Sequence, residues 1–580
     1  MTQDELFCQA PPRLANQYDD DRLLRALVRR HFGDHLASVE EELRGLGELA
    51  GGELYRQQLD EIRDEPELVR WDAWGRRVDR VRLTGLWERA AALATGHGLV
   101  ATAYEGEYGA LSRILQFAKV HLIHPSTDVY SCPLAMTDGA ARTLLESGNK
   151  ALIERAVPRL TSRDPATAWT SGQWMTEATG GSDVGRSETR AVRQDDGSWR
   201  LYGRKWFTSA VTSDMALALA RPDGNAAGAS GLALFYVETR DDEGLPRGMR
   251  MTRLKDKLGT RKVPTAELIL EGAPATLVKD PENGVRDIVP MLVVTRAWNS
   301  VCAVATMRRG LALARDFAAR RVAFGKPLSE HPLHLDTLAG LQAELEGAFH
   351  LTFRLVALIG RYENGELQAS DAAQLRLLSS LTKLVTGRQA VAAASEVLEC
   401  FGGAGYVEDT GLPLLLRDSQ VLPIWEGTTN VLALDFLRAL DEVGGMHTLR
   451  ELVSAALAGC RKSKLARAAQ QAWDEINQAA DWYEARRMQG DEAGLQAGAR
   501  RFALDVGRAL QIALACEHAQ WAADEDGDRR PTDAARYLAA GSEPLLRLKP
   551  GPTRRLALDL ATHEDADCVR PESDGRAGRP

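Results

Sequence analysis

The spacing of hydrophobic positions changes twice along the chain. From residue 17 to residue 165 apolar side chains recur at steps of three and four, as in Asp20–Leu49, which predicts amphipathic helices. Between Ala166 and about Val278 they form short runs separated by turn residues, and Asp196-Gly197 between alternating segments predicts a β-hairpin. Helical spacing returns at Ile288 and continues to about Leu440. Helices, then strands, then helices make an α+β protein with segregated elements.

The same pattern predicts where the domains begin and end. A further helical stretch covers Leu449–Trp521, and residues after Ala561 have no apolar periodicity, which is typical of a disordered tail. We therefore predict an N-terminal helical domain, a middle β-barrel-like domain, a C-terminal helical bundle, a helical extension and a disordered tail, over residues 1–165, 166–280, 281–440, 441–560 and 561–580.

Composition narrows the class of protein. The chain has 580 residues, 44% hydrophobic and 26% charged, with a formal net charge of -9. These values are ordinary for a soluble globular protein, and the acidic balance argues against an obligate nucleic-acid binder.

The seven cysteines are odd in number and widely spaced, which favours reduced thiols. The acidic N-terminus does not resemble a secretory signal, and no apolar run approaches a membrane span. We expect a cytoplasmic protein.

Several common motifs are missing from the sequence. The glycine-rich segment Gly402-Gly403-Ala404-Gly405 follows a helical pattern instead of a strand and does not complete G-x-G-x-x-G, so it does not predict a Rossmann site. His121 and His124 lie close together without further ligand residues. We predict no metal site.

Four segments carry candidate chemistry, although each has a plain structural interpretation on its own. A glycine-rich turn, a strand with a buried tryptophan, a helix end and a surface carboxylate would account for them separately. They are Trp174–Asp183, Gly203–Ser209, Arg320–Lys326, and Gly402–Tyr406 followed by Arg417-Asp418 and Ile424–Asn430.

In this order, on an α–β–α layout, the four segments resemble those of the acyl-CoA dehydrogenase superfamily, over about residues 15–440. The resemblance implies an N-terminal helical domain, a middle β domain and a C-terminal four-helix bundle. It implies FAD bound between the β domain and the bundle, and a homotetramer or homodimer in which a neighbouring subunit completes the FAD site. It also implies an acyl-CoA substrate and an electron-transfer flavoprotein or other electron acceptor.

The resemblance assigns cofactor contacts residue by residue. Met175, Thr176, Gly181 and Ser182 match the flavin loop, with Ala178 in place of the usual proline. Trp206 would shield the flavin edge, and Thr208 would approach its N5 atom. Arg321 would pair with the pyrophosphate of a neighbouring subunit's FAD, a role suited to a guanidinium fork. The other implied cofactor contacts are Phe207, Phe324, His331, Gly402, Gly403, Thr428 and Asn430.

Glu426 matches the family's catalytic base. The reaction removes a proton from Cα of an acyl thioester while a hydride leaves Cβ, and a carboxylate in a dry pocket is a stronger base toward a weakly acidic C–H bond. Some family members place the base at the position of Thr295, which is not a carboxylate here. Ser182, Arg296 and Gly427 are the implied substrate contacts.

The match is closer to the AidB-like branch of the superfamily, through Trp71–Asp79, Gly180-Gly181, Leu254–Gly259 and Trp425. We predict α,β-dehydrogenation of a medium- to long-chain acyl-CoA. The alternatives are a DNA-binding flavoprotein of an alkylation or stress response and an acyl-CoA-sequestering protein with little turnover. A flavin-dependent oxidase or monooxygenase ranks third.

DNA protection in this branch depends on a basic C-terminal domain. Residues 441–580 instead contain 20 Lys and Arg against 23 Asp and Glu, a net charge of -3, and one tight basic cluster at Arg461–Lys464. Nucleic-acid binders need concentrated positive charge, so DNA is an unfavoured partner.

Overall fold

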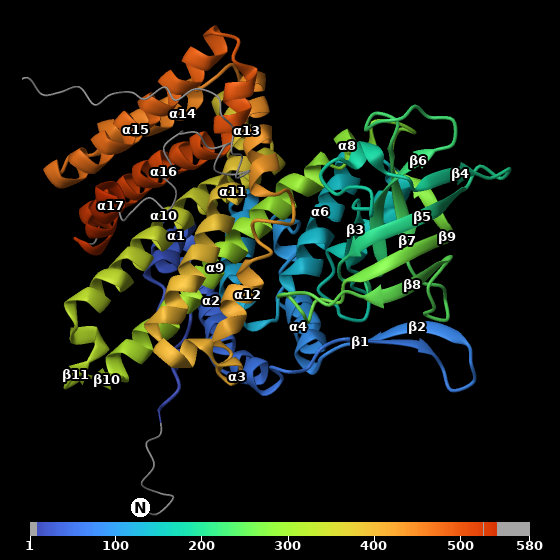
Figure 1. The fold of residues 1–580 in the computed structure, drawn as a ribbon, viewed down its shortest axis with the longest axis horizontal. Helices are drawn as coiled ribbons and strands as arrows, with labels where there is room; N and C mark the ends of the chain where they lie inside the picture. The colour runs from blue at the N-terminus through green and yellow to red at the C-terminus, as the bar shows by residue number, and fades with distance from the viewer. Residues whose placement is uncertain (1–8, 526, 542–580) are drawn as a thin grey trace, which may run out of the picture. The chain divides into compact units, whose positions relative to one another are not determined.

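A computed structural model of the chain describes residues 9–525 and 527–541. Its N-terminal part is mainly helical (Figure 1). Asp21 caps the first helix by accepting hydrogen bonds from the amides of Leu23 and Leu24, both at 3.0 Å. The helices are α1 (Arg22–Phe32), α2 (Leu36–Gly51), α3 (Glu53–Asp60), α4 (Gly85–Gly96), α5 (Ser112–Ile123), α6 (Ser131–Ser147) and α7 (Lys150–Leu160).

One β-hairpin interrupts the helices predicted over residues 17–165, and its two strands were not predicted. Strands β1 (Glu67–Trp71) and β2 (Arg77–Arg82) pair antiparallel. The hairpin reaches the β domain, where the Asp79 carboxylate accepts a 2.9 Å hydrogen bond from the Met251 amide. Only one face of the hairpin packs on a core, and the exposed positions of both strands are mostly charged. The alternation of apolar and polar residues that predicts a strand is therefore hard to recognise in the sequence.

The middle domain is a closed β-sheet, which confirms the β-barrel-like prediction. Strands β6, β4, β5, β9 and β7 pair in that order, and β7 pairs back to β6. Closure leaves few free edges, which protects the strands from pairing with other chains. Strand β3 adds to β6 in parallel, and β8 adds to β9. The strands are β3 (Ser171–Trp174), β4 (Arg190–Arg193), β5 (Trp199–Thr208), β6 (Met215–Pro222), β7 (Ala233–Glu238), β8 (Met249–Leu254) and β9 (Ala266–Leu277).

Long helices follow the barrel. Short α8 (Gly284–Asp287) leads into α9 (Val289–Arg320), and α10 (Pro332–Glu363), α11 (Ala369–Cys400), α12 (Leu412–Ser419) and α13 (Thr429–Val443) come next. Within the described residues, α9 is the one helix long and apolar enough to cross a membrane, and 67% of its most apolar window is buried, as expected of a core helix. Strands β10 (Val322–Ala323) and β11 (Lys326–Pro327) form a small hairpin between α9 and α10.

The helical extension packs on the bundle. It contains α14 (His447–Gly459), α15 (Ser463–Met488), α16 (Glu492–Glu525) and α17 (Arg530–Ala540). Arg508 of α16 and Glu344 of α10 form an ion pair at 2.5 Å. In the predicted basic cluster, Arg461 pairs with Asp524 at 2.5 Å, so part of its charge is neutralised within the chain. The predicted tail, 561–580, and residues 542–560 of the extension lie outside the described residues.

Candidate active site

Glu426 lies in the turn between α12 and α13, in an unusual backbone conformation. Its φ is 57°, in the left-handed region that side chains other than glycine rarely adopt, and Gly427 follows with φ 107°. A Cβ at Gly427 would lie 2.8 Å from the Leu432 side chain, so glycine is required there for space as well as for conformation. The surrounding contacts must hold this turn in place.

Helix α9 holds the turn from one side. The Thr295 hydroxyl donates a 2.7 Å hydrogen bond to Oε2 of Glu426. One residue later, Arg296 donates to the Glu426 carbonyl at 3.4 Å and forms a 3.1 Å ion pair with Asp435 of α13. The Trp425 indole donates to the amide oxygen of Asn299, one helical turn further on. Three residues of helix α9 therefore hold the backbone and the carboxylate of the turn in place.

Helix α11 holds the turn from the other side through Lys383. This lysine is fully buried, and its ammonium donates a 2.5 Å hydrogen bond to the Gly427 carbonyl. Burial lowers the pKa of Lys383 to about 7, although the nearby Glu426 carboxylate opposes the shift. The pKa of a lysine shifts readily when the side chain is buried. A titratable cation thus lies beside the candidate base.

Two buried titratable groups near the turn, Cys132 and Lys257, also have shifted pKa values. Burial raises the pKa of the Cys132 thiol of α6 to about 12, with smaller effects from Lys257 and Glu426. Burial likewise lowers the pKa of Lys257 to about 8. Lys257 belongs to the segment between β8 and β9. The charges of Lys257 and Glu426 therefore both act on the Cys132 thiol of α6.

The predicted flavin loop lies against strand β5. The Trp206 amide donates to the Thr176 carbonyl at 3.0 Å, which joins two of the four predicted segments. Glu177, next to Thr176, is buried and forms a 2.7 Å ion pair with buried Lys205. Burial alone would raise the pKa of Glu177, but Lys205 and the Thr189 hydroxyl lower it below its usual value. This ion pair anchors the loop to the barrel.

The loop and strand carry aromatic side chains at the surface of the barrel. Phe207 is 49% exposed, Trp206 and Met175 are partly buried, and Gly181 and Ser182 are exposed. The Lys255 ammonium lies 3.7 Å from the centre of the Trp206 ring. Thr208 is buried, and its hydroxyl donates to the Ala266 carbonyl at 2.6 Å, so this hydroxyl hydrogen is used within the sheet. Its predicted approach to flavin N5 stays a prediction.

Other predicted cofactor residues lie at the opposite end of helix α9. Thr295 stands in the first two turns of this helix and Arg321 directly follows its end. Twenty-six residues of α-helix extend about 39 Å. Arg321 therefore cannot reach the Glu426 turn of its own subunit. The distance fits the expectation that it serves a neighbouring subunit.

Phe324 and His331 lie beside Arg321. Phe324 and Gly325 form the two-residue turn of the β10–β11 hairpin, with φ of 50° and 83°, as the tight turn of a hairpin requires. Phe324 is 97% exposed, and His331 bonds the Ala323 carbonyl at 3.0 Å. Our alternative interpretation of Phe324-Gly325 as a helix cap was wrong, because the chain reverses there. The hairpin displays a phenylalanine on the surface.

Gly402 and Gly403 belong to the same end of the bundle. Phe401 packs on Phe317 of α9 at 4.9 Å between ring centres, close to Arg321 in the chain. No atom lies within 4 Å of a Cβ built on either glycine, so the backbone there is open to a ligand. Thr428 and Asn430 instead flank the Glu426 turn, and both are exposed.

Sequence reasoning missed Lys383. The signal was available, because a lysine inside an apolar helical stretch with no compensating acid nearby in the chain is unusual. Arg296 was predicted as a substrate contact, but its guanidinium is already engaged with Asp435 and Ser380, so here it braces the turn.

Three models of known protein families match consecutive parts of the chain. Residues 9–165 match the adaptive response protein AidB N-terminal domain, residues 172–273 the acyl-CoA dehydrogenase middle domain, and residues 282–440 the acyl-CoA dehydrogenase C-terminal domain. The predicted AidB-like branch is thereby confirmed.

Individual relatives span most of the chain. Acyl-CoA dehydrogenase family member 11 of Caenorhabditis elegans is 45% identical over 75% of this chain and 72% of its own length. Putative acyl-CoA dehydrogenase AidB of Escherichia coli is 33% identical over 76% of this chain and 80% of its own. The crystal structure of Caenorhabditis elegans ACDH-11 in complex with C11-CoA has a TM-score of 0.90 at 38% identity, over 96% of this chain and 97% of that one. The chain therefore belongs to the acyl-CoA dehydrogenase family.

Proposed function

We propose that this protein oxidises an acyl-CoA thioester between Cα and Cβ, with Glu426 as the base and FAD as the hydride acceptor. The observation that carries the proposal is the Glu426 carboxylate, which Thr295 orients at 2.7 Å on a turn held by two bundle helices. The position of a base must be fixed before its strength matters.

The residues present fit FAD, the cofactor that members of this family bind. The exposed Phe207 and the partly buried Trp206 and Met175 offer apolar surface for a flat ring, and the backbone of Gly181 is accessible beside Thr176. The open glycines 402 and 403 and the guanidinium of Arg321 suit a phosphate-bearing cofactor. These residues lie at two ends of a long helix, which supports a site shared between subunits in a homodimer or homotetramer.

When bound, FAD would supply the acceptor for the hydride, which carries both electrons of the oxidation. The chain itself positions and moves the proton. Glu426 takes the proton from Cα at its carboxylate, and Thr295 keeps one oxygen engaged so that the other faces the substrate. Arg296 and Lys383 hold the carbonyls of Glu426 and Gly427 and so prevent the strained turn from relaxing.

A medium- to long-chain acyl-CoA is the substrate class that we propose. The related Caenorhabditis elegans protein has been crystallised with C11-CoA, a chain of this class. An electron-transfer flavoprotein or another acceptor would remove the two electrons after each turnover, because the cofactor must be reoxidised.

The test is an anaerobic titration of the FAD-loaded protein with saturated acyl-CoAs of increasing chain length, followed by absorbance at the flavin band. We expect bleaching, with its largest rate for a medium or long chain. An acyl-CoA that binds without bleaching at any length would contradict turnover and favour sequestration. Formation of the trans-2-enoyl-CoA, measured by mass spectrometry, confirms the bond that is oxidised.

A further inference from the structure

Two cysteines of the helical extension lie together in the fold. Cys460 directly follows α14 and Cys516 lies in α16, with the whole of α15 between them in the chain. A side-chain hydrogen bond joins the two thiols. Neither cysteine forms a disulfide in the structure. A pair of thiols in contact can be oxidised to a disulfide, since the two sulfurs need only a small movement to reach the bond length of about 2 Å.

The packing of α16 on the connection between α14 and α15 holds the two thiols in place. Gln520 lies one helical turn after Cys516, and its side-chain oxygen accepts hydrogen bonds from the Arg461 amide at 3.0 Å and the Lys462 amide at 3.4 Å. The Cys516 sulfur itself lies 3.9 Å from the Leu465 carbonyl near the start of α15. One side of α16 therefore lies against residues 460–465, so the contact between the sulfurs is a consequence of the helix packing.

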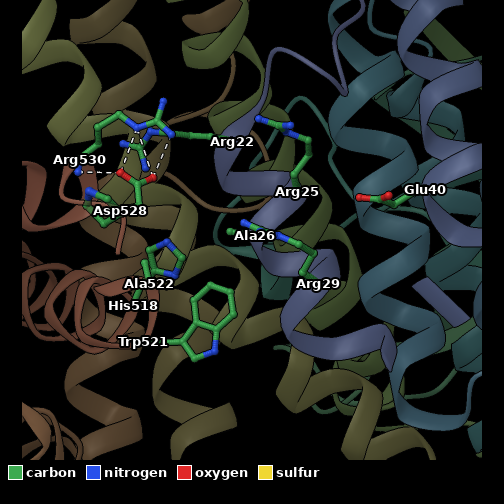
Figure 2. Close-up of a pocket in the computed structure, with 11 residues that line it drawn as sticks. Arg22, Arg25, Ala26, Arg29, Glu40, His518, Trp521, Ala522, Asp528 and Arg530 are labelled. Atoms are coloured by element: carbon green, nitrogen blue, oxygen red, sulfur yellow. Dashed lines mark hydrogen bonds and ion pairs between the residues drawn. The ribbon is translucent and has the colours of Figure 1, made fainter. Parts of the chain in front are cut away.

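Another side of α16 faces the N-terminal helix α1. His518 and Trp521 line a cavity between the two helices (Figure 2), and Glu517 forms a 2.7 Å ion pair with Arg30 of α1. Successive residues of an α-helix are about 100° apart around its axis, so the cavity and Cys516 lie on different sides of α16. A covalent bond at Cys516 would therefore hold the helix that connects the extension to the N-terminal domain.

The two thiols differ in accessibility and in acidity. Cys460 is 9% exposed, whereas Cys516 is fully buried. The hydrogen bond from the Cys516 thiol lowers the pKa of Cys460, although burial and the nearby Glu517 oppose this shift. The same hydrogen bond, together with burial, raises the pKa of Cys516. Because the thiolate is the reactive form, Cys460 is the sulfur that attacks an oxidant and Cys516 is the sulfur that completes the bond.

The charges around Cys460 also favour its reaction. The basic cluster Arg461–Lys464 follows it directly, and the lysines at 462 and 464 are exposed. Reactive cysteines are found in electropositive, partly exposed surroundings, whereas buried structural cysteines are inert. Cys400 of α11 is a contrast within this chain, because burial raises its pKa to about 11 and Glu396 and Glu399 add to the shift.

We propose that Cys460 and Cys516 are a modification site, at which a peroxide forms a reversible disulfide between the α14–α15 connection and α16. The deprotonated Cys460 sulfur attacks one peroxide oxygen, the O–O bond breaks, and a sulfenic acid forms as hydroxide leaves. The Cys516 sulfur then attacks the Cys460 sulfur, the S–O bond breaks, and the Cys516 proton leaves with the hydroxyl group as water. The two sulfurs lose two electrons in total, and the peroxide gains both.

The experiment treats the FAD-loaded full chain with hydrogen peroxide and blocks the remaining thiols with iodoacetamide. Peptides are then mapped by mass spectrometry without a reductant. Two variants separate the roles of the sulfurs: Cys460→Ser removes the attacking thiol, and Cys516→Ala removes the second thiol. Cys400 is the control within the same sample, since it is a buried thiol with a raised pKa.

We expect a peptide pair joined through Cys460 and Cys516, which dithiothreitol separates again. Cys460 should be oxidised at least about tenfold faster than Cys400. In the Cys516→Ala variant dimedone should label Cys460, because the sulfenic acid has no thiol to react with. In the Cys460→Ser variant Cys516 should stay reduced.

The proposal is overturned if peroxide does not join Cys460 to Cys516 in the native protein, or if Cys460 pairs equally with other cysteines of the chain. It is also overturned if Cys400 is oxidised as fast as Cys460, or if Cys516 is oxidised at an unchanged rate in the Cys460→Ser variant, since either result would mean that the thiols react through unfolding. If the buried substitution Cys516→Ala prevents folding, the native protein and Cys460→Ser still decide the question.

Discussion

The Thr295 hydroxyl donates a 2.7 Å hydrogen bond to Oε2 of Glu426, so the position that some relatives use for the base here supports a base that lies elsewhere in the chain. One helix residue and one turn residue, 131 positions apart in sequence, therefore form a functional pair.

Replacement of the base is the most direct test of this pair. Glu426→Gln keeps the size and the acceptor for Thr295 but cannot take a proton. We expect the rate of flavin bleaching by acyl-CoA to fall by about 10²–10⁴-fold. FAD content, measured by absorbance after gel filtration, should be unchanged. Bleaching at the native rate would remove Glu426 from its role.

Thr295 is expected to matter through its hydroxyl alone. Thr295→Val removes the donor at nearly constant volume, and we expect the bleaching rate to fall by about tenfold, the effect of one hydrogen bond to a charged group. Thr295→Ser keeps the donor and serves as the control. Equal rates for the valine and serine variants would show that the hydrogen bond does not position the base.

Lys383 should introduce a pH dependence near neutrality. Its pKa of about 7 means that it is charged below this pH and neutral above it. Loss of the positive charge beside Glu426 makes the carboxylate a stronger base, so we expect the single-turnover rate to rise as the pH increases through about 7.

The matched variant for this step is Lys383→Gln, which keeps a hydrogen-bond donor for the Gly427 carbonyl but does not titrate. The rise near pH 7 should disappear from its profile of rate against pH. A profile identical to that of the native protein would assign the titration to another group, such as Lys257, whose pKa is about 8.

The Glu177–Lys205 ion pair should control the stability of the flavin loop. Lys205→Met leaves a buried carboxylate without its partner, which costs about 3–5 kcal/mol in the free energy of unfolding. Denaturant unfolding measures this loss. The double variant Glu177→Gln with Lys205→Met should be more stable than Lys205→Met alone. If it is less stable, the buried charge is not the cause.

The placement of Arg321 far from Glu426 predicts complementation between subunits. We expect Arg321→Ala to lose FAD and Glu426→Gln to lose turnover. When the two variants are co-expressed, a shared site in a heteromer combines both defects in one site and leaves another site native, so activity returns. If both residues serve the same subunit, every site carries one defect and no activity returns.

The sequence was sufficient for the layers of the fold and for the Glu426 segment, because periodicity and motif order are local properties. It was insufficient for the β1–β2 hairpin, whose outer face is charged. It was also insufficient for the reversal at Phe324-Gly325, because a phenylalanine followed by a glycine resembles a helix end in sequence, although both residues have positive φ in a hairpin turn. The role of Lys383 depends on contacts between segments far apart in the chain, which no local pattern records.

The left-handed backbone of Glu426 has a consequence for the stability of the fold. A glycine at this position would adopt φ 57° without the cost of about 1 kcal/mol that a side chain incurs there. The fold therefore carries a local conformational cost at residue 426, which the hydrogen bond from Thr295 to the carboxylate helps to offset. The chain thus places its candidate base on a backbone conformation that suits glycine better than glutamate.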